Sequence, residues 1–204
     1  MNKKFFDLPE EKQRSIINAG YRVFSRNSYK KSPMSEIAAS AKISKSLLFH
    51  YFKNKQELYI FLWEKCAHMT IDYLTRYGCY EQTDLFEMMY RGMEAKMRLW
   101  KKYPFMGNFV IRAMYEKDPA VCPAIQKSYQ KFLDFKANTA RLNLNPEQFI
   151  PGLDVGMMYK QMYWASEGYL REKLAQGPLV VEEMEKDFIE MLNFWKHVYM
   201  RKEG

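Results

Sequence analysis

The chain has 204 residues, of which 48% are hydrophobic, so it is long enough and apolar enough to bury a core and is not a disordered tail or linker. The formal net charge is +8, and +7 of it lies in residues 1–60, which hold 12 Lys and Arg against 5 Asp and Glu. A positive field confined to one end of a chain attracts a polyanion and indicates a nucleic acid as partner, although a basic domain without such a partner has the same composition.

The cysteines and the absence of apolar runs indicate the compartment. Cys66, Cys79 and Cys122 are far apart and form no CxxC pair, which favours a reducing environment over a disulfide framework. No signal-like apolar stretch occurs at the N-terminus, and no run reaches the roughly 18 apolar residues of a membrane span. We therefore expect a soluble, cytoplasmic protein with no membrane partner.

The first predicted elements are short helices. Pro9, Glu10 and Glu11 suit a helix N-terminus, and apolar residues follow at helical spacing up to Phe24. A second start signal lies at Ser32, which we expect to be the N-cap of a helix with proline in its first turn. After a turn at 42–44, another short helix runs to about residue 51.

Longer helices fill the remainder. Asn54 and Glu57 form a capping-box pattern at the start of a helix that ends near Gly78. Proline and glycine then bound helices at about 83–102, 104–116, 121–141, 153–176 and 181–200. Because no alternating strand pattern and no internal repeat occur, the predicted fold class is all-α with about nine helices.

The two short helices at about 32–51 have the composition of a helix-turn-helix. Ala38 and Ala41 allow close helix approach, and Ser44 is an N-cap candidate for the second helix. In the major groove, Lys45 can reach a phosphate or a guanine edge, and Leu47 can pack on a thymine methyl. The residues predicted to contact DNA are Ser32, Ser35, Lys42, Ser44, Lys45, Ser46, Leu47, Phe49, His50, Lys53 and Lys55.

Residues 9–60 resemble the N-terminal domain of the TetR family of transcriptional regulators. The ungapped positions that carry the resemblance are Phe24, Tyr29, Ser32, Ile37, Ala38, Ala41, Ile43, Ser44, Lys45, Leu48, His50, Tyr51, Phe52, Lys55 and Leu58. The resemblance implies a three-helix DNA-binding domain at 1–53 and a larger ligand-binding and dimerisation domain at 54–204. It further implies a homodimer that binds a palindromic operator in double-stranded DNA, and a repressor released when a small apolar or aromatic effector shifts the fourth helix.

Five positions depart from the family's usual pattern. Ser28 and Lys42 stand where glycine is usual, Pro33 where serine or threonine is common, Ser46 where glycine or alanine is common, and Phe49 in place of tyrosine. At position 42 we expect a left-handed backbone at a cost of about 1 kcal/mol. These departures leave the fold intact and make the operator sequence the least transferable feature.

Residues 69–162 hold 10 of the 15 methionines together with many aromatic side chains. This composition suits a pocket for a bulky apolar molecule, or equally a Met-rich helical core. Within it, Arg112 would favour a carboxylate ligand, whereas an acid beside aromatic rings would favour a cation. The residues predicted to bind the effector are Tyr73, Phe86, Met89, Tyr90, Met93, Met97, Trp100, Phe109, Arg112, Tyr129, Phe132, Met158 and Met162.

The last two predicted helices carry more apolar residues than one core face requires. They could pair with the same helices of a second subunit as a four-helix interface, or pack within one subunit. The residues predicted at the dimer interface are Ala165, Tyr169, Met184, Phe188, Met191, Leu192, Trp195 and Tyr199.

No catalytic motif is present. His50, His68 and His197 belong to no HExxH pattern, and no GxSxG, P-loop or Gly-rich dinucleotide turn occurs, so we predict no enzyme activity, metal or cofactor. Two alternatives stay open. An all-α enzyme or carrier of small molecules would show no salt-dependent DNA binding, and a ligand-free architectural DNA-binding dimer would not respond to any metabolite.

Overall fold

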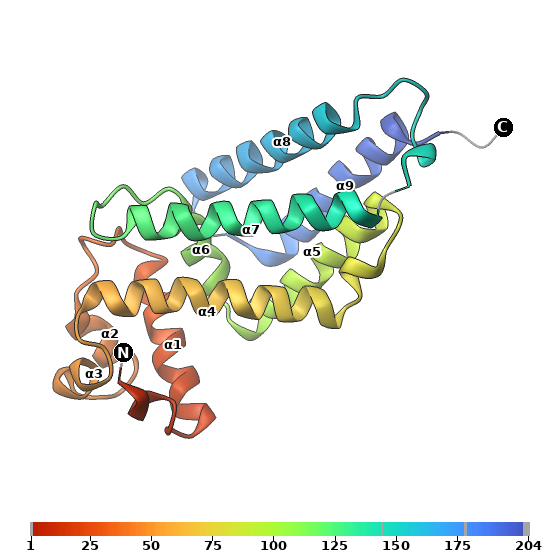
Figure 1. Cartoon of the computed structure of the whole chain (residues 1–204). Helices are drawn as coiled ribbons and strands as arrows, with labels where there is room; N and C mark the ends of the chain where they lie inside the picture. Colours follow the sequence, from red (N-terminus) through yellow and green to blue (C-terminus); the bar gives the residue numbers. More distant parts are fainter. Residues whose placement is uncertain (1, 144, 178, 202–204) are drawn as a thin grey trace. The chain divides into compact units, whose positions relative to one another are not determined.

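The computed structural model describes residues 2–143, 145–177 and 179–201, with side chains outside 135–143. This part of the chain forms the helices drawn in Figure 1, with three short 3-10 turns, η1 (Lys3–Phe5), η2 (Cys79–Glu81) and η3 (Pro146–Gln148). The helices are α1 (Glu10–Phe24), α2 (Met34–Ser40), α3 (Lys45–Tyr51), α4 (Lys55–Arg76), α5 (Leu85–Lys102), α6 (Met106–Met114), α7 (Cys122–Asn143), α8 (Val155–Gln176) and α9 (Val181–Tyr199). The prediction of an all-α fold is confirmed.

The helix starts follow local capping chemistry, with one correction. Ser44 is the N-cap of α3, as predicted, and its hydroxyl accepts from the Leu47 amide at 3.1 Å. Asn54 accepts from the Glu57 amide at 2.8 Å at the start of α4. The prediction of Ser32 as N-cap is wrong, because its hydroxyl donates to the Ser28 carbonyl at 3.0 Å and the N-cap of α2 is Pro33.

The helices pack as two compact units. Unit 1 comprises Met1–Met69 and Lys102–Phe132, and unit 2 comprises Thr70–Lys101 and Leu133–Gly204. Unit 1 thus contains α1, α2, α3 and α6, unit 2 contains α8, α9 and nearly all of α5, and α4 and α7 contribute residues to both. The predicted domain boundary at residue 53 does not coincide with the division at Met69/Thr70 between these packed units, and it remains a prediction.

Aromatic rings fill the core of unit 1. The buried Tyr21 donates its hydroxyl to the Leu62 carbonyl at 3.0 Å, which ties α1 to α4. Phe109 of α6 is fully buried, with its ring centroid 5.2 Å from that of Tyr21 and 5.1 Å from that of Tyr59. Such edge and tilted contacts hold the N-terminal helices and α6 as one packed body.

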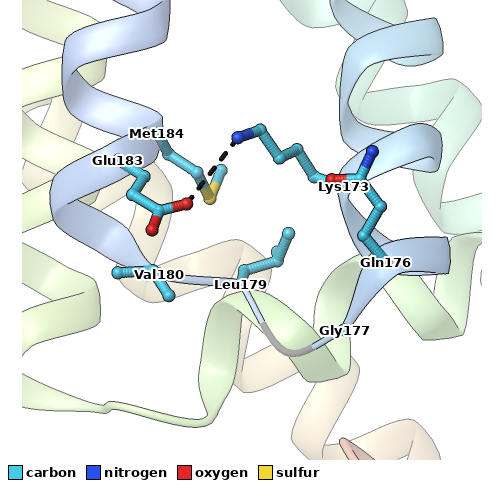
Figure 2. Close-up of a pocket in the computed structure, with 7 residues that line it drawn as sticks. All are labelled: Lys173, Gln176, Gly177, Leu179, Val180, Glu183 and Met184. Atoms are coloured by element: carbon cyan, nitrogen blue, oxygen red, sulfur yellow. Dashed lines mark ion pairs between the residues drawn. The ribbon is translucent and has the colours of Figure 1, made fainter.

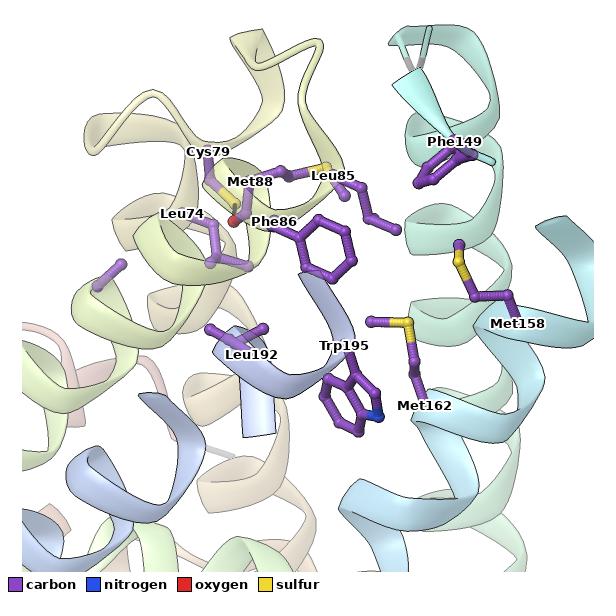
Figure 3. Packing of buried hydrophobic residues seen from close by; sticks show 11 residues of the cluster. Leu74, Cys79, Leu85, Phe86, Met88, Phe149, Met158, Met162, Leu192 and Trp195 are labelled. Carbon is purple, nitrogen blue, oxygen red and sulfur yellow. Dashed lines mark hydrogen bonds between the residues drawn. The ribbon is translucent and has the colours of Figure 1, made fainter. Parts of the chain in front are cut away.

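Unit 2 has a separate core rich in methionine. Its buried members come from α4, α5, α8, α9 and the segments beside them, and Figure 3 labels all of them except Ala95: Leu74, Cys79, Leu85, Phe86, Met88, Ala95, Phe149, Met158, Met162, Leu192 and Trp195. At Gly92 of α5 the backbone passes close to η2, since a Cβ there would lie 3.3 Å from the Cys79 sulfur, which is tighter than most Cβ contacts. Methionine suits this core because its flexible side chain fills irregular gaps between helices.

Candidate nucleic-acid interface

The turn between α2 and α3 is a Schellman motif centred on Lys42. Lys42 has a φ of 56°, the left-handed value expected from the sequence. The Lys42 amide donates to the Ala39 carbonyl and the Ile43 amide to the Ala38 carbonyl, both at 3.0 Å. These two bonds satisfy the last carbonyls of α2 and set the direction in which α3 leaves the turn.

The outer face of α3 is exposed while its inner face is anchored. Leu48 is fully buried and Tyr51 is buried, so they fix the helix in the core of unit 1. On the outer face, Leu47 is 37% exposed and Phe49 is 40% exposed, and the Lys45 ammonium lies 5.9 Å from the Phe49 ring. Of the predicted DNA contacts, those with exposed side chains are Ser35, Lys42, Ser44, Lys45, Ser46, Leu47, Phe49, His50 and Lys53.

Two predicted DNA contacts are instead engaged inside the protein. Ser32 is fully buried, so a phosphate contact by its hydroxyl would require the α1–α2 loop to open. The Lys55 ammonium donates to the Tyr29 carbonyl at 2.8 Å and to the Lys30 carbonyl at 3.2 Å. It also lies 4.4 Å from the centre of the Tyr29 ring, so a phosphate would have to compete with three interactions.

Tyr29 is held from a second direction by Glu116, a charged residue that the sequence suggested as a ligand contact and not as part of the DNA-binding region. Glu116, in the loop between α6 and α7, accepts from the Tyr29 amide at 2.7 Å through one carboxylate oxygen. Its other oxygen accepts from the Lys117 amide at 2.9 Å and the Asp118 amide at 3.0 Å. Both backbone polar groups of Tyr29 are therefore bound by charged side chains, Lys55 from α4 and Glu116 from the α6–α7 loop.

A second bond joins the same loop to α4. The Gln56 side chain donates to the Ala120 carbonyl at 2.5 Å. The charge of Glu116 also acts on Tyr59 of α4. Burial, and secondly this nearby negative charge, raise the pKa of Tyr59 well above its usual value. The loop that follows α6 is thus bonded to the α1–α2 loop and to the first turn of α4, the two segments that flank the helix-turn-helix.

The residues predicted to bind the effector divide between the two units. Phe109, Arg112, Tyr129 and Phe132 belong to unit 1, and the others belong to unit 2. In unit 2, Phe86, Met158 and Met162 lie in the packed core of Figure 3, which is the Met-rich core that the sequence left as an alternative. Met93 and Met97 are buried as well, whereas Tyr90 is 43% exposed.

Buried polar groups identify further candidates for a ligand contact. The Arg112 Nε and the Trp63 Nε1 are both buried donors without a hydrogen-bond partner among the residues that the structure describes, and both belong to unit 1. In unit 2, burial lowers the pKa of Lys96, which forms no ion pair with any residue that the structure describes. Buried donors left unpaired cost about 1–3 kcal/mol each, so they favour a ligand or water that accepts from them.

A small hollow at the α8–α9 connection, shown in Figure 2, has a volume of about 220 Å³. It is lined by Lys173, Gln176, Gly177, Leu179, Val180, Glu183 and Met184. None of these was predicted to bind the effector. Its volume lies below the roughly 300–1,000 Å³ of ordinary ligand pockets, and the Lys173 ammonium already lies 3.7 Å from the Glu183 carboxylate across it. We do not assign an effector to it.

The residues predicted at the dimer interface lie on both sides of α8 and α9. Met184, Leu192 and Trp195 are buried within unit 2, so for these three the structure supports packing inside the subunit. Ala165 is exposed, and Tyr169, Phe188, Met191 and Tyr199 are half-buried. The large apolar side chains that α8 and α9 expose were not among the predicted interface residues. They are Met157, Trp164, Phe194 and Val198, of which Phe194 is 64% exposed.

Neither a metal site nor a membrane segment was found in the described ranges. Residues 2–143, 145–177 and 179–201 contain no group of three His, Cys, Asp or Glu side chains arranged to hold a metal ion. No helix within the same ranges combines the length and the apolar character needed to cross a bilayer.

Comparison with known proteins gives a family match over part of the chain and similar folds over nearly all of it. Residues 16–60 match the family model of the bacterial regulatory proteins of the tetR family. No curated protein matches the chain. Among solved structures, a TetR family transcriptional regulator from Chloroflexus aurantiacus is 16% identical, with a TM-score of 0.62 over 98% of this chain and 99% of that one.

Two further similar structures have more specific descriptions. The fatty acid degradation regulator FadR from Bacillus halodurans is 15% identical, with a TM-score of 0.65 over 87% of this chain and 96% of that one. The ketosteroid transcriptional regulator KstR2 of Mycobacterium tuberculosis is 14% identical, with a TM-score of 0.65 over 96% of this chain and 97% of that one. At such identities the likeness shows a shared fold.

Proposed function

We propose that this chain, which belongs to the TetR family of transcriptional regulators, is a repressor that binds a palindromic operator as a homodimer and leaves it when a small apolar ligand binds. Regulators of this family are DNA-binding transcription factors and not enzymes, which argues against the enzyme or carrier alternative. The observation that carries the proposal is the exposed face of α3, fixed by a Schellman turn and a buried inner face within the segment that holds +7 of the net charge.

The outer face of α3 suits the major groove. Lysine offers donors for phosphate or guanine, and the exposed Leu47 and Phe49 offer apolar contact for thymine methyl groups. Exposed Lys42 and Lys53 flank the helix on either side and supply sequence-independent attraction to phosphates. An apolar surface alone would not select DNA. Apolar side chains surrounded by lysines do suit it, because DNA offers phosphates to the lysines and thymine methyl groups to the apolar side chains.

The contacts of Tyr29 support a route from ligand to DNA. Because Glu116 and Lys55 hold the amide and the carbonyl of one residue, a shift of the α6–α7 loop changes the position of the loop that leads into α2. A ligand with different affinity for the two positions shifts the balance between DNA-competent and DNA-incompetent states. A ligand-free architectural DNA-binding dimer would have no use for the bond that joins the α6–α7 loop to Tyr29.

The chemistry of the effector is part of the proposal. The methionines and aromatic rings of unit 2 favour an apolar body, and Lys96 of the same unit, whose pKa burial lowers, favours an acidic or carbonyl group at one end. One similar structure is a fatty acid degradation regulator and another is a ketosteroid transcriptional regulator, and both names fit a largely apolar effector. We therefore propose an apolar acid, such as a fatty acid or its derivative.

The exposed apolar residues of α8 and α9 support the homodimer. Trp164 is 54% exposed and Phe194 is 64% exposed, and both belong to long helices that suit a four-helix interface between subunits. A dimer with twofold symmetry places two α3 helices on a palindromic site, so each half-site is read by the same residues.

Binding to DNA selected from a randomised duplex pool tests the proposal. Fluorescence anisotropy at low salt should detect tight binding to a palindrome, with an affinity that falls steeply as salt rises. Lys45→Ala should weaken operator binding roughly 5- to 100-fold, whereas Lys127→Ala, on the exposed face of α7, should leave it unchanged. A C16 fatty acid should release the DNA. If the wild-type chain enriches no duplex at low salt, the proposal is wrong.

A further inference from the structure

The N-terminal segment Asn2–Phe5, which no sequence motif marked, is docked on the C-terminal end of α3. Its backbone is held there because the Asn2 amide donates to the Tyr51 carbonyl at 3.0 Å. The Asn2 side-chain amide also donates to the His50 carbonyl at 3.1 Å. Both acceptors belong to the last turn of α3, whose carbonyls have no partner within the helix.

The orientation of the Asn2 side chain is determined by its partners. Its oxygen accepts from the Lys4 amide at 3.1 Å, so the nitrogen is the atom that faces α3. That nitrogen also lies 3.4 Å from Nε2 of His50. One side chain therefore caps the 3-10 turn of Lys3–Phe5 and binds the end of α3 at the same time.

Phe5 anchors the other end of the segment. It is fully buried, with its ring centroid 5.1 Å from that of Phe52 and 5.3 Å from that of Phe61. Lys3 and Lys4 lie between the two anchors, so their backbone is fixed relative to α3. Both lysine side chains are exposed, and neither forms an ion pair with a residue in the described ranges.

We propose that Asn2–Phe5 is a fixed extension of the DNA-binding surface, in which Lys3 and Lys4 bind backbone phosphates beside the bases read by α3. This inference rests on the proposed function and deepens it. Two cations attached to the end of a helix in the major groove lie where the groove is bordered by phosphates. Asn2 acts as a positioning residue, because it contacts α3 and not the DNA.

Phosphate, rather than base edges, is the chemistry that these residues fit. Lysine is a flexible point charge that binds phosphate without a fixed geometry. The segment carries no exposed side chain apart from the two lysines, since Phe5 is buried and Asn2 is occupied by α3. Lys3 and Lys4 should therefore add affinity that depends on salt and not on base sequence.

The test measures the salt dependence of operator binding for full-length variants. In the double variant Lys3→Gln, Lys4→Gln, the slope of log affinity against log salt should become shallower by about 1.8 for each subunit, because two phosphates are no longer neutralised. Discrimination between operator and scrambled duplex should be unchanged. The double variant Lys127→Gln, Lys131→Gln removes the same charge from the exposed face of α7 and should keep the wild-type slope.

Asn2→Ala separates anchoring from charge. This variant keeps both lysines but loses the side-chain bonds to α3 and the cap of the turn, so operator affinity should fall 2- to 5-fold with only a small fall in melting temperature. A wild-type slope in the Lys3/Lys4 double variant, while the wild-type protein binds the operator, would overturn the inference and leave the proposed function standing. Absence of DNA binding by the wild type would instead overturn both.

Discussion

The α3 surface and the α8–α9 surface both expose large apolar side chains, but the charges around them differ. Leu47 and Phe49 lie in the first 60 residues, which carry a net +7, whereas Trp164 and Phe194 lie in the remaining chain, which carries a net +1. Exposed apolar side chains among excess cations fit DNA, which offers both phosphates and methyl groups. The same side chains without excess charge fit another apolar protein surface, so the surrounding charge indicates the partner better than exposure does.

Phe194→Glu should have the largest effect, because it tests whether the α8–α9 surface is a subunit interface. An unpaired carboxylate buried between two subunits costs about 3–5 kcal/mol, so the dimer should dissociate at micromolar concentration. Light scattering measures the mass, and operator affinity should fall at least about 100-fold because two half-sites are no longer bound together. The neighbouring exposed Asn193→Glu is the control. A dimer that survives Phe194→Glu would remove α9 from the proposed interface.

Phe109→Ala should come next, because it tests whether this predicted effector residue is a core residue of unit 1. Removal of a fully buried phenyl ring from the cluster with Tyr21 and Tyr59 should destabilise the protein by about 3–5 kcal/mol, measured by urea unfolding. DNA binding should weaken at temperatures where unit 1 begins to unfold. Unchanged stability with a changed ligand response would assign Phe109 to the effector pocket instead.

Glu116→Gln tests the link between the α6–α7 loop and the helix-turn-helix. One carboxylate oxygen becomes an NH2 group that cannot accept, so a bond from Tyr29 or from the Lys117 and Asp118 amides is lost, at about 1.5–3 kcal/mol. We expect DNA affinity to fall and the effector to release DNA less completely, both measured by anisotropy. Glu147→Gln, on an exposed residue of unit 2, is the control. Full effector release by the Glu116 variant would show that another path carries the signal.

Lys55→Ala distinguishes a DNA contact from a structural tie. If Lys55 serves mainly to hold Tyr29, the melting temperature should fall by about 2–6 °C while the salt slope of DNA binding stays at the wild-type value. A slope that becomes shallower by about 0.9 per subunit, with unchanged stability, would restore the phosphate contact predicted from the sequence.

Asp187→Asn should have the smallest effect. Hydrogen bonds from Tyr169 and Lys173 lower the pKa of Asp187, so its ionised form is favoured in the folded protein. A lowered folded pKa gives stability that is fully present above the unfolded value of 3.8 and is lost as pH falls through the folded pKa. Calorimetry should show the variant less stable than wild type by under about 1 kcal/mol at pH 7, with a difference that shrinks below pH 3.8. A difference that grows in acid would contradict this assignment.

Local chemistry made the helices and the α2–α3 turn predictable. Ser44, Asn54 and Lys42 each act on atoms within a few residues of themselves, so their cap and turn geometries follow from short-range sequence. Ser32 was assigned wrongly because its hydroxyl can either cap the start of α2 or donate to the Ser28 carbonyl. Only the path of the α1–α2 loop decides which of the two bonds forms.

The remaining features depend on which distant segments meet. The stripe on α9 showed apolar residues at helical spacing, but the stripe alone cannot tell whether Leu192 and Trp195 face their own subunit or another one. In the same way, nothing near Asn2 indicates that it binds His50 and Tyr51, nearly 50 residues away, because such a bond requires the chain to return to α3.

The sequence by itself therefore determined the all-α class, the order and rough extent of the helices, and the resemblance of residues 16–60 to the tetR family model, because periodicity, capping and charge are properties of neighbouring residues. Only the tertiary structure decided that Ser32 and Phe109 are buried, that Lys55 and Glu116 hold Tyr29, and which face of α9 is exposed. The physical reason is that burial and long-range hydrogen bonds depend on packing between segments that lie far apart in the chain, and no local pattern encodes that pairing.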